Sequence, residues 1–233
     1  DETTFDDARR VLRITHTEDL LPKPVVDYIK NGSADQETPK AFPQNTYFLI
    51  NTLPDSCKIA EQVAREMGLN AVTLTTFLEG ESREAGMFFA SLAREIQTNS
   101  RPFSAPCVIL AAGETTTKIS DNAEIRGHGG PSHELVAAFA LAASKVPGAC
   151  MLSIDTEGTD GTTLYAGGLT DSKTAEAARL AGIDLYEALR GHAVGEALVA
   201  LNDAVFTGNT GTNLCDLNVL YVPAAASDRF KKS

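Results

Sequence analysis

Short apolar runs alternate with amphipathic segments through the middle of this 233-residue chain. The runs at 46–51, 70–76 and 107–113 have the length and apolar character of buried strands, whereas 55–68 and 81–97 repeat apolar residues at helical spacing. Strands that alternate with helices of this length form βαβ units, in which helices cover both faces of the sheet. The pattern therefore predicts an α/β fold with three layers, α/β/α, and a largely parallel, mixed sheet.

The second half of the chain continues the pattern less regularly. Alternating β-branched residues predict a strand at 114–120 that turns at 121–124, and an apolar segment predicts a buried helix at 132–146. Further strands are expected at 149–155 and 216–222. Between these two strands, shorter helices are expected at 171–182, 184–191 and 193–202.

The first 45 residues follow a different pattern. Residues 3–14 predict a short helix capped by Thr3 or Thr4, and residues 22–32 predict another that starts at a proline and stops at a glycine. Residues 33–45 lack hydrophobic periodicity and contain two prolines, which is typical of a linker. We therefore expect a helical connecting segment and linker over residues 1–45, and an α/β domain over residues 46–233.

The net charge and the cysteine content limit the classes of partner and the compartment that we expect. The net charge of −11 disfavours non-specific binding to nucleic acid and to anionic membranes, so a small molecule or another protein is the expected partner. The four cysteines form no CxxC pair, which favours buried free thiols in a reducing compartment, and we expect a cytoplasmic protein. No apolar run is long enough to span a membrane, and the charged start does not resemble a signal peptide. Because the first residue is not Met, it stays open whether the chain begins inside a longer polypeptide.

The stretch "RGHGGPSHE" at 126–134 places three glycines before a buried helix. Glycines at a helix N-terminus let backbone N–H groups wrap an anion such as phosphate, and Arg126 and His128 would add positive charge. The alternative interpretation is a tight turn in which Ser132 caps the helix. The stretch alone does not decide between the two.

Three acidic residues follow predicted strands or lie in glycine-rich loops. Glu114 follows the strand at 107–113, Asp155 ends the strand at 149–155, and Asp160 lies in "GTDG". Such carboxylates could hold Mg²⁺ or orient a hydroxyl group in phosphoryl transfer, although a single loop aspartate more often makes a local turn. Among the histidines, His128 is a candidate phosphate contact or general acid.

His133 is placed at the start of the predicted helix, whereas His16 and His192 lie in ordinary helical context. No nucleophile motif accompanies His16 or His192. We therefore interpret these two as surface or structural histidines.

The chain resembles the MOFRL domain, the C-terminal half of the glycerate 2-kinases, a family long labelled hydroxypyruvate reductase. The resemblance runs in order through nearly the whole chain. It rests on "TFDDARRVL", "LPKPVVDYIKNG", "LEGESREAG", "GETTTK", "RGHGGPSHELVAAFALA", "GTDG", "AGGLTD" and "TGNTGTNLCDLNVLYV".

The resemblance implies transfer of the γ-phosphoryl group of ATP to the 2-hydroxyl of glycerate, with ATP and Mg²⁺ as cofactors. In that family the site lies in a cleft between this half and a Rossmann-like N-terminal domain, so the implied partners are that domain, a nucleotide and a glycerate-like hydroxy acid, with a homodimer as a further expectation. The expected catalytic residues are Glu114, Asp160 and Glu134, and the expected metal ligands are Asp160 and Asp155. The residues expected to bind phosphate, nucleotide or substrate are Thr115, Arg126, His128, Gly129, Gly130, Ser132, Thr159, Gly161, Thr212 and Asn213.

Several motif positions depart from the family pattern. In G-x-G-G-R-N-Q-E, the Arg, Asn and Gln are replaced by Pro131, Ser132 and His133, while the glycines and Glu134 remain. Loss of the guanidinium removes a planar bidentate donor for phosphate. The acidic positions after Asp160 are also lost, whereas the G-P-T-G-T-N loop is nearly intact at 208–213.

Three interpretations follow from this mixture of kept and lost residues. The first is the kinase half itself, and the second is a non-catalytic nucleotide- or metabolite-binding module of the same fold. The third is an NAD-dependent hydroxypyruvate reductase. Its dinucleotide fingerprint is weak, because the spacing from Gly127 to Asp155 exceeds the usual ~20 residues.

Overall fold

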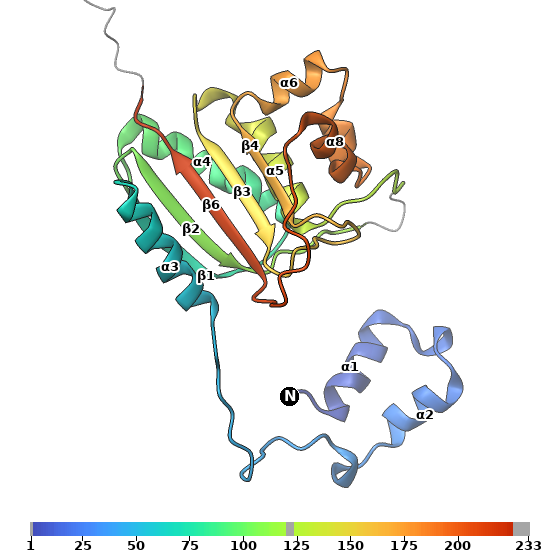
Figure 1. Cartoon of the computed structure of the whole chain (residues 1–233). Helices are drawn as coiled ribbons and strands as arrows, with labels where there is room; N and C mark the ends of the chain where they lie inside the picture. The colour runs from blue at the N-terminus through green and yellow to red at the C-terminus, as the bar shows by residue number, and fades with distance from the viewer. Residues whose placement is uncertain (1, 120–123, 226–233) are drawn as a thin grey trace, which may run out of the picture. The chain divides into compact units, whose positions relative to one another are not determined.

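The computed structural model describes residues 2–119 and 124–225. The chain divides into two compact units, residues 1–50 and residues 51–233, and each is described by itself (Figure 1). Within the described ranges, no helix is long and apolar enough to cross a membrane.

The first unit is a pair of short helices, α1 (Phe5–Thr15) and α2 (Lys23–Asn31), with short 3₁₀ turns after each. Thr4 caps α1 in a reciprocal arrangement, because the Asp7 carboxylate accepts from the backbone N–H of Thr4 at 2.9 Å while the Thr4 hydroxyl accepts from the backbone N–H of Asp7. Arg9 joins the helices by donating its Nε–H to the carbonyl oxygen of Ile29 at 3.1 Å. Both predicted helices are confirmed.

The strand predicted at 46–51 is wrong. This stretch has no regular secondary structure, and its apolar side chains are exposed, from 65% for Leu49 to 100% for Ile50. The unit that contains most of it offers only helices as neighbours, so the backbone finds no strand with which to pair. An apolar run identifies a segment suited to burial but does not specify its partner.

The second unit is built on one six-stranded sheet in the order β1-β2-β6-β3-β4-β5. The mixed sheet of an α/β fold is confirmed, but the expectation that it is largely parallel is wrong. Only β1 and β2 pair in parallel, and the other four pairings are antiparallel. The strands are β1 (Asn70–Leu78), β2 (Cys107–Gly113), β3 (Cys150–Asp155), β4 (Gly167–Asp171), β5 (Ala204–Val205) and β6 (Asp216–Val222).

The position of β6 explains why the strand predicted after β2 is missing. β6 lies antiparallel between β2 and β3, so β2 is already paired on both sides, with β1 and with β6. The strand predicted at 114–120 therefore does not form over 114–119, where only Thr116 makes an isolated bridge to Glu81. Residue 120 and most of the predicted turn at 121–124 lie outside the described residues.

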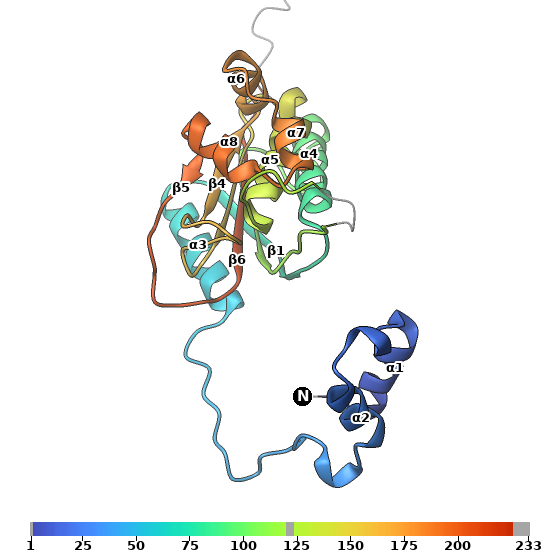
Figure 2. The same cartoon turned by 90° about the vertical axis from the view of Figure 1, so that its right-hand side faces the viewer.

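Helices cover both faces of the sheet, as predicted (Figures 1 and 2). α3 (Leu53–Glu66) packs on β1 and β2 from one side, and the other side holds the main core with α4 (Ser82–Asn99) and α5 (Pro131–Ala142). Outside α5 lie α6 (Thr174–Leu180), α7 (Leu185–Arg190) and α8 (Val194–Leu201). The nearly all-apolar α5 is buried because it is enclosed between the sheet and these helices.

Close packing of α4 on α5 is predicted to depend on Gly86. A Cβ atom at Gly86 would overlap the backbone carbonyl oxygen of Leu135 on α5. Replacing glycine by alanine inside a helix normally stabilises it by about 1 kcal/mol, but the overlap with fixed backbone costs about 1 to 3 kcal/mol or more. We therefore expect Gly86→Ala to lower the free energy of unfolding in a urea titration.

Ser91→Ala is the matched control, because Ser91 is an exposed residue of the same helix. It is expected to raise the free energy of unfolding by a few tenths of a kcal/mol. A Gly86→Ala variant as stable as Ser91→Ala would show that the contact of α4 with α5 is not close-packed.

Candidate active site

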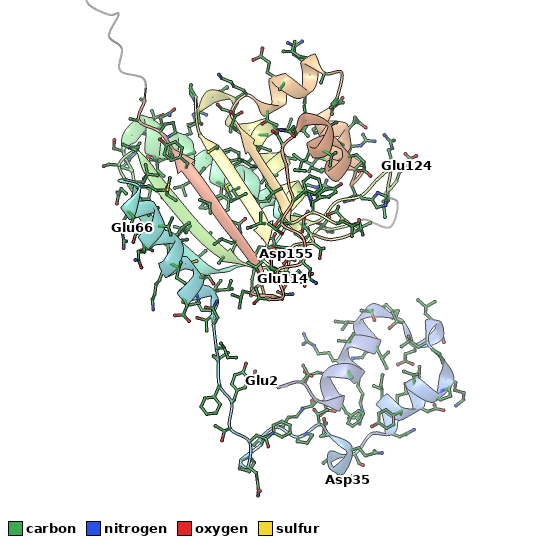
Figure 3. The ribbon with its side chains drawn as sticks, viewed as in Figure 1. Glu2, Asp35, Glu66, Glu114, Glu124 and Asp155 are labelled. Carbon is green, nitrogen blue, oxygen red and sulfur yellow. The ribbon has the colours of Figure 1, made fainter. Side chains whose placement is uncertain are left out.

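Carboxylates from the ends of three neighbouring strands, with Asp160 from the loop after β3, lie at one edge of the sheet, and we call Glu114, Asp155, Asp160 and Asp216 the acidic edge. Asp155 ends β3 and faces Asp216, the first residue of β6, across the strand pair. On its other side Asp216 faces Gly113, which ends β2 directly before Glu114. Figure 3 shows Glu114 and Asp155 together at this edge.

In the acidic edge, burial and neighbouring negative charges disfavour the ionised forms of Asp155 and Asp216. Burial raises the pKa of Asp216 to about 7, helped by the charges of Asp160 and Asp155 and opposed by a backbone N–H of Thr115. Burial likewise raises the pKa of Asp155, and its acidic neighbours add to the effect. Within the described part of the chain, no group of three or more His, Cys, Asp or Glu side chains forms a ready-made metal cage.

The carboxylate of Asp160 lies against the N-terminus of α5. Its Oδ2 accepts from the backbone N–H of His133 at 2.9 Å, and the Nδ1 atom of the His133 ring contacts the same oxygen. Both side chains are buried, and the His133 ring packs edge-on against Tyr165 with ring centroids 5.1 Å apart. The anion at this helix end is therefore the carboxylate of Asp160.

Ser132 does not cap α5, so the alternative of a Ser132 N-cap is wrong. The N-cap is Gly130, and Ser132 lies inside the first turn, fully buried, where its Oγ accepts from the hydroxyl of Ser153 at 2.8 Å. Pro131 starts the helix, a position where the missing N–H costs nothing.

A cavity of about 440 Å³ lies beside the glycine-rich stretch, and we call it the glycine pocket. Its lining includes Gly129 and Gly130 from that stretch, Gly161 and Thr162 from the "GTDG" loop, and the side chains of Glu134 and His192. The two loops touch through their backbones, since the N–H of Thr162 donates to the carbonyl oxygen of Gly129 at 3.1 Å. Gly161 has a φ of +59°, and a Cβ there would overlap the same carbonyl oxygen.

Arg126 and His128 are already paired with acidic residues. Arg126 bonds to Glu124 at 2.7 Å and lies 3.4 Å from Glu187. The Nδ1 atom of His128 is 2.7 Å from Glu196, which also accepts from the His128 backbone N–H. Both side chains are therefore engaged by carboxylates.

The loop at 207–213 is bonded to Glu157, whose backbone N–H donates to the acidic-edge carboxylate of Asp155 at 2.9 Å. The side-chain amide of Asn213 donates to Glu157 at 2.9 Å, and the hydroxyl of Thr159 donates to the same carboxylate at 3.2 Å. Thr212 is exposed in this loop, and buried Thr115 follows Glu114 on the other side of the edge. Sequence reasoning selected Thr159, Thr212 and Asn213 but not Glu157.

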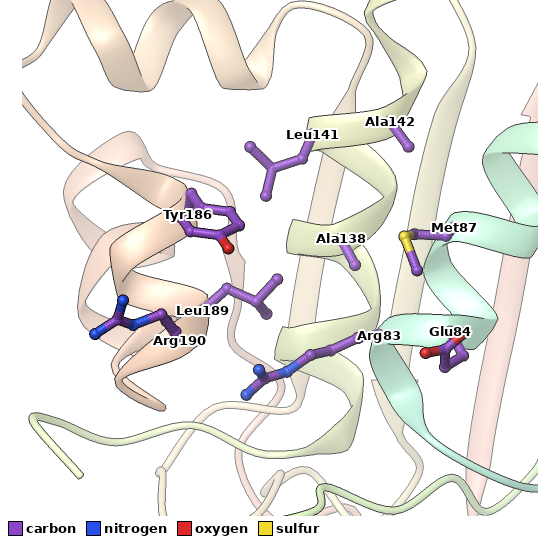
Figure 4. Close-up of a pocket in the computed structure, with 9 residues that line it drawn as sticks. All are labelled: Arg83, Glu84, Met87, Ala138, Leu141, Ala142, Tyr186, Leu189 and Arg190. Atoms are coloured by element: carbon purple, nitrogen blue, oxygen red, sulfur yellow. The ribbon is translucent and has the colours of Figure 1, made fainter. Parts of the chain in front are cut away.

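Sequence reasoning also missed two of the three residues in a cluster around the buried Glu134. Glu134 on α5 is 1% exposed, and its Oε2 accepts from the Nε–H of Arg83 at 2.6 Å. Its Oε1 lies 2.7 Å from Nδ1 of His192, which follows α7. Figure 4 shows Arg83 reaching from α4 toward the space between α5 and α7, where it lines a cavity of about 400 Å³.

Comparison with known proteins agrees with this fold. Residues 107–216, which include the acidic edge and the glycine pocket, match the family described as "MOFRL family". Residues 107–216 are a MOFRL-family domain.

Relatives of this chain carry the names of glycerate kinases and of hydroxypyruvate reductases. It is 35% identical to a glycerate 2-kinase of Pyrococcus horikoshii, a match that covers 95% of this chain and 50% of the relative. It is 32% identical to a protein of Agrobacterium vitis that carries the name hydroxypyruvate reductase, over 95% of this chain and 56% of the relative. The crystal structure of a glycerate kinase from Thermotoga maritima superposes with a TM-score of 0.76 and 34% identity, covering 95% of this chain and 51% of that one. The chain therefore spans about half the length of these relatives.

The structure accounts for one departure of this MOFRL domain from the family motif. His133 stands where the family pattern has Gln, and it contacts the carboxylate of Asp160, which the pattern retains. In this chain the Asp160 carboxylate is therefore directed toward α5.

Asp216→Asn is expected to remove a pH-dependent penalty on stability. The pKa of Asp216 rises from 3.8 to about 7 on folding, so above about pH 4 the unfolded chain loses a proton that the folded chain keeps. The free energy of unfolding therefore falls as pH rises from about 4 to about 7, by up to about 4 kcal/mol from this group.

The measurement is urea unfolding of the parent and the Asp216→Asn variant at pH values of about 4 and about 7.5. The stability advantage of Asp216→Asn should grow between the two pH values. Parallel pH dependences of the two proteins would contradict the assignment.

Proposed function

We propose that this chain is the MOFRL half of a kinase that transfers the γ-phosphoryl group of ATP to the 2-hydroxyl of glycerate or a related hydroxy acid. The observation that carries the proposal is the acidic edge beside the glycine pocket, in a chain whose relatives are named glycerate 2-kinase. Phosphoryl transfer needs cation-stabilised phosphates next to an acceptor hydroxyl, and these two features supply adjacent places for both.

The acidic edge fits Mg²⁺ bound together with phosphate. Mg²⁺ usually takes one or two carboxylates and completes its shell with phosphate oxygens and water, so a complete protein cage is not required. Asp155 and Asp216 are the ligands we assign, because their raised pKa values reflect burial and negative charge that a cation would offset. When bound, the ion neutralises charge on the transferred phosphoryl group.

Asp160 serves this site indirectly. Because its carboxylate is held at the start of α5, we assign it to positioning that helix and to the negative field at Asp216, in place of the ligand role expected from the sequence. Phosphate would then be held by the backbone of Gly129 and Gly130 and by the loop that contains Thr212 and Asn213. A cavity of about 530 Å³ lined by Gly80, Gly113 and Glu114 adjoins the edge and offers room for the nucleotide.

The remaining partners follow from the family. We place the rest of the site on a Rossmann-like N-terminal domain, in keeping with relatives about twice as long as this chain. We also propose that the protein works in the cytoplasm. The partners in the reaction are a small hydroxy acid and a nucleotide.

A second candidate is a nucleotide-binding module without turnover. It is favoured by the replacement of the family Arg by Pro131, which removes a phosphate donor, and by the contact of His133 with Asp160. A reductase has no comparable support from the geometry.

The test is phosphorus NMR of Mg²⁺, ATP and glycerate incubated with the natural protein that contains this chain. Formation of phosphoglycerate and ADP is the expected result, with calorimetric titration of Mg²⁺-ATP as the accompanying binding measurement. Saturable nucleotide binding without phosphoglycerate would favour the second candidate, and absence of both would contradict the kinase.

Mg²⁺ is also expected to stabilise this chain through Asp216. At pH of about 7.5, millimolar Mg²⁺ should raise the melting temperature of the parent chain, and Asp216→Asn should abolish that rise because the charge that attracts the ion is gone. Asp203→Asn is the control, since Asp203 is also a carboxylate whose pKa is raised by burial, but it bonds to Thr174 away from the acidic edge. If Mg²⁺ raised the melting temperatures of Asp216→Asn and Asp203→Asn equally, Asp216 would not be a metal ligand.

A further inference from the structure

We propose that His192, oriented by Glu134, is the general base that accepts the proton of the acceptor hydroxyl. This inference rests on the proposed kinase function. It assigns a catalytic role to a histidine that the sequence alone places in ordinary helical context.

The carboxylate of Glu134 fixes the imidazole of His192. Glu134 is buried, and its two oxygens contact Arg83 at 2.6 Å and His192 Nδ1 at 2.7 Å. An ionised carboxylate only accepts hydrogen bonds, so the short contact to Nδ1 requires a proton on that nitrogen. In the neutral ring Nε2 then carries the lone pair, which is the form that a general base needs.

Arg83 binds the second oxygen of Glu134. Its Nη2 lies 3.1 Å from His192 Nδ1, and because a guanidinium only donates, that contact would need a lone pair on Nδ1. The contact of Nδ1 with Glu134 is shorter, at 2.7 Å, and needs a proton there, so we assign the tautomer from the shorter contact. The charge-assisted bond from Arg83 therefore holds Glu134 in place from one side while His192 occupies the other.

The backbone places His192 in the turn that ends α7. Its φ of +53° is in the left-handed region, as is common where a helix terminates. The Ala193 N–H closes this turn by donating to the carbonyl oxygen of Ala188 at 2.9 Å.

The glycine pocket gives His192 access to a substrate. His192 and Glu134 line this cavity of about 440 Å³ together with Gly129, Gly130 and Gly161. That volume accommodates a small hydroxy acid and a phosphoryl group. Gly130 lies directly against the carboxylate of Asp160, which ties the pocket to the acidic edge.

The other titratable side chains around the pocket already have hydrogen-bond partners. His128 is largely exposed and bonded to Glu196, and both oxygens of Glu134 are taken. Among the described residues that line the pocket, His192 is thus the buried side chain whose second nitrogen is available as a base.

The proposed reaction transfers one phosphoryl group and one proton. The 2-hydroxyl oxygen bonds to the γ-phosphorus of ATP as the bond from that phosphorus to the bridging oxygen breaks, and ADP leaves. The hydroxyl proton passes to Nε2 of His192, and Glu134 stabilises the resulting imidazolium. The proton then passes to solvent after the product leaves.

The first test is ¹⁵N NMR of the labelled chain without ligands, which reports the tautomer of each histidine. His192 is expected to be protonated at Nδ1 and free at Nε2, with exposed His16 as an internal reference. A His192 ring protonated at Nε2 with Nδ1 free would overturn the inference whether or not the protein is a kinase.

The second test is steady-state kinetics of the natural protein with His192→Asn. Asparagine can place an amide N–H where Nδ1–H lies, so it can keep the bond to Glu134 while removing the base. We expect kcat to fall by about 10²- to 10⁴-fold with a nearly unchanged KM, whereas His16→Asn should match the parent. In His192→Ala, added imidazole should restore part of the lost turnover.

The outcomes separate this inference from the proposed function. An active parent with an equally active His192→Asn variant would overturn the role of His192 and leave the kinase intact. A loss in His192→Ala that imidazole does not restore would assign His192 a structural role and overturn the inference. A parent without transfer would overturn the proposed function, and the role of His192 with it.

Discussion

Antiparallel pairing of β6 between β2 and β3 determines where this protein can do chemistry. β2 and β3 run in the same direction, so their carboxyl ends reach the same edge of the sheet, and the first residue of β6 lies between them. Asp216 is thereby buried between acidic neighbours, and burial first, with their charges adding to it, raises its pKa to about 7. A sheet edge of this kind stores electrostatic repulsion that a bound cation can relieve.

The same edge changes how the glycine-rich stretch can act. A helix N-terminus attracts an anion through its free N–H groups, and in α5 the carboxylate of Asp160 already satisfies one of them. An incoming phosphate would have to compete with a covalently tethered carboxylate, so the exposed loop backbone is the better place for it. The glycines then serve close approach, since Gly130 and Gly161 let the two loops touch without side chains between them.

Hydrophobic periodicity predicts the elements of this fold but not their pairing. The predicted helices and most of the strands form because burial of one face is encoded locally, as in α4 and β2. The order of the sheet is a long-range property, so the apolar stretch at 46–51 was mistaken for a strand. The acidic edge was partly predictable from carboxylates after strands. The contacts of Glu134 with Arg83 and His192 were not, because these residues lie 51 and 58 positions away in the chain.

The cluster of Arg83, Glu134 and His192 is hard to explain by stability alone. Removing a carboxylate from water costs several kcal/mol, and buried ion pairs often contribute less than apolar residues of the same volume would. A cluster of this kind is therefore weak evidence for stabilisation, and its geometry needs another reason. Two donors converge on Glu134 from α4 and from the end of α7, and both Glu134 and His192 border the glycine pocket. Orienting the imidazole of His192 beside the glycine pocket is a functional reason for burying the carboxylate of Glu134, and packing alone gives no such reason.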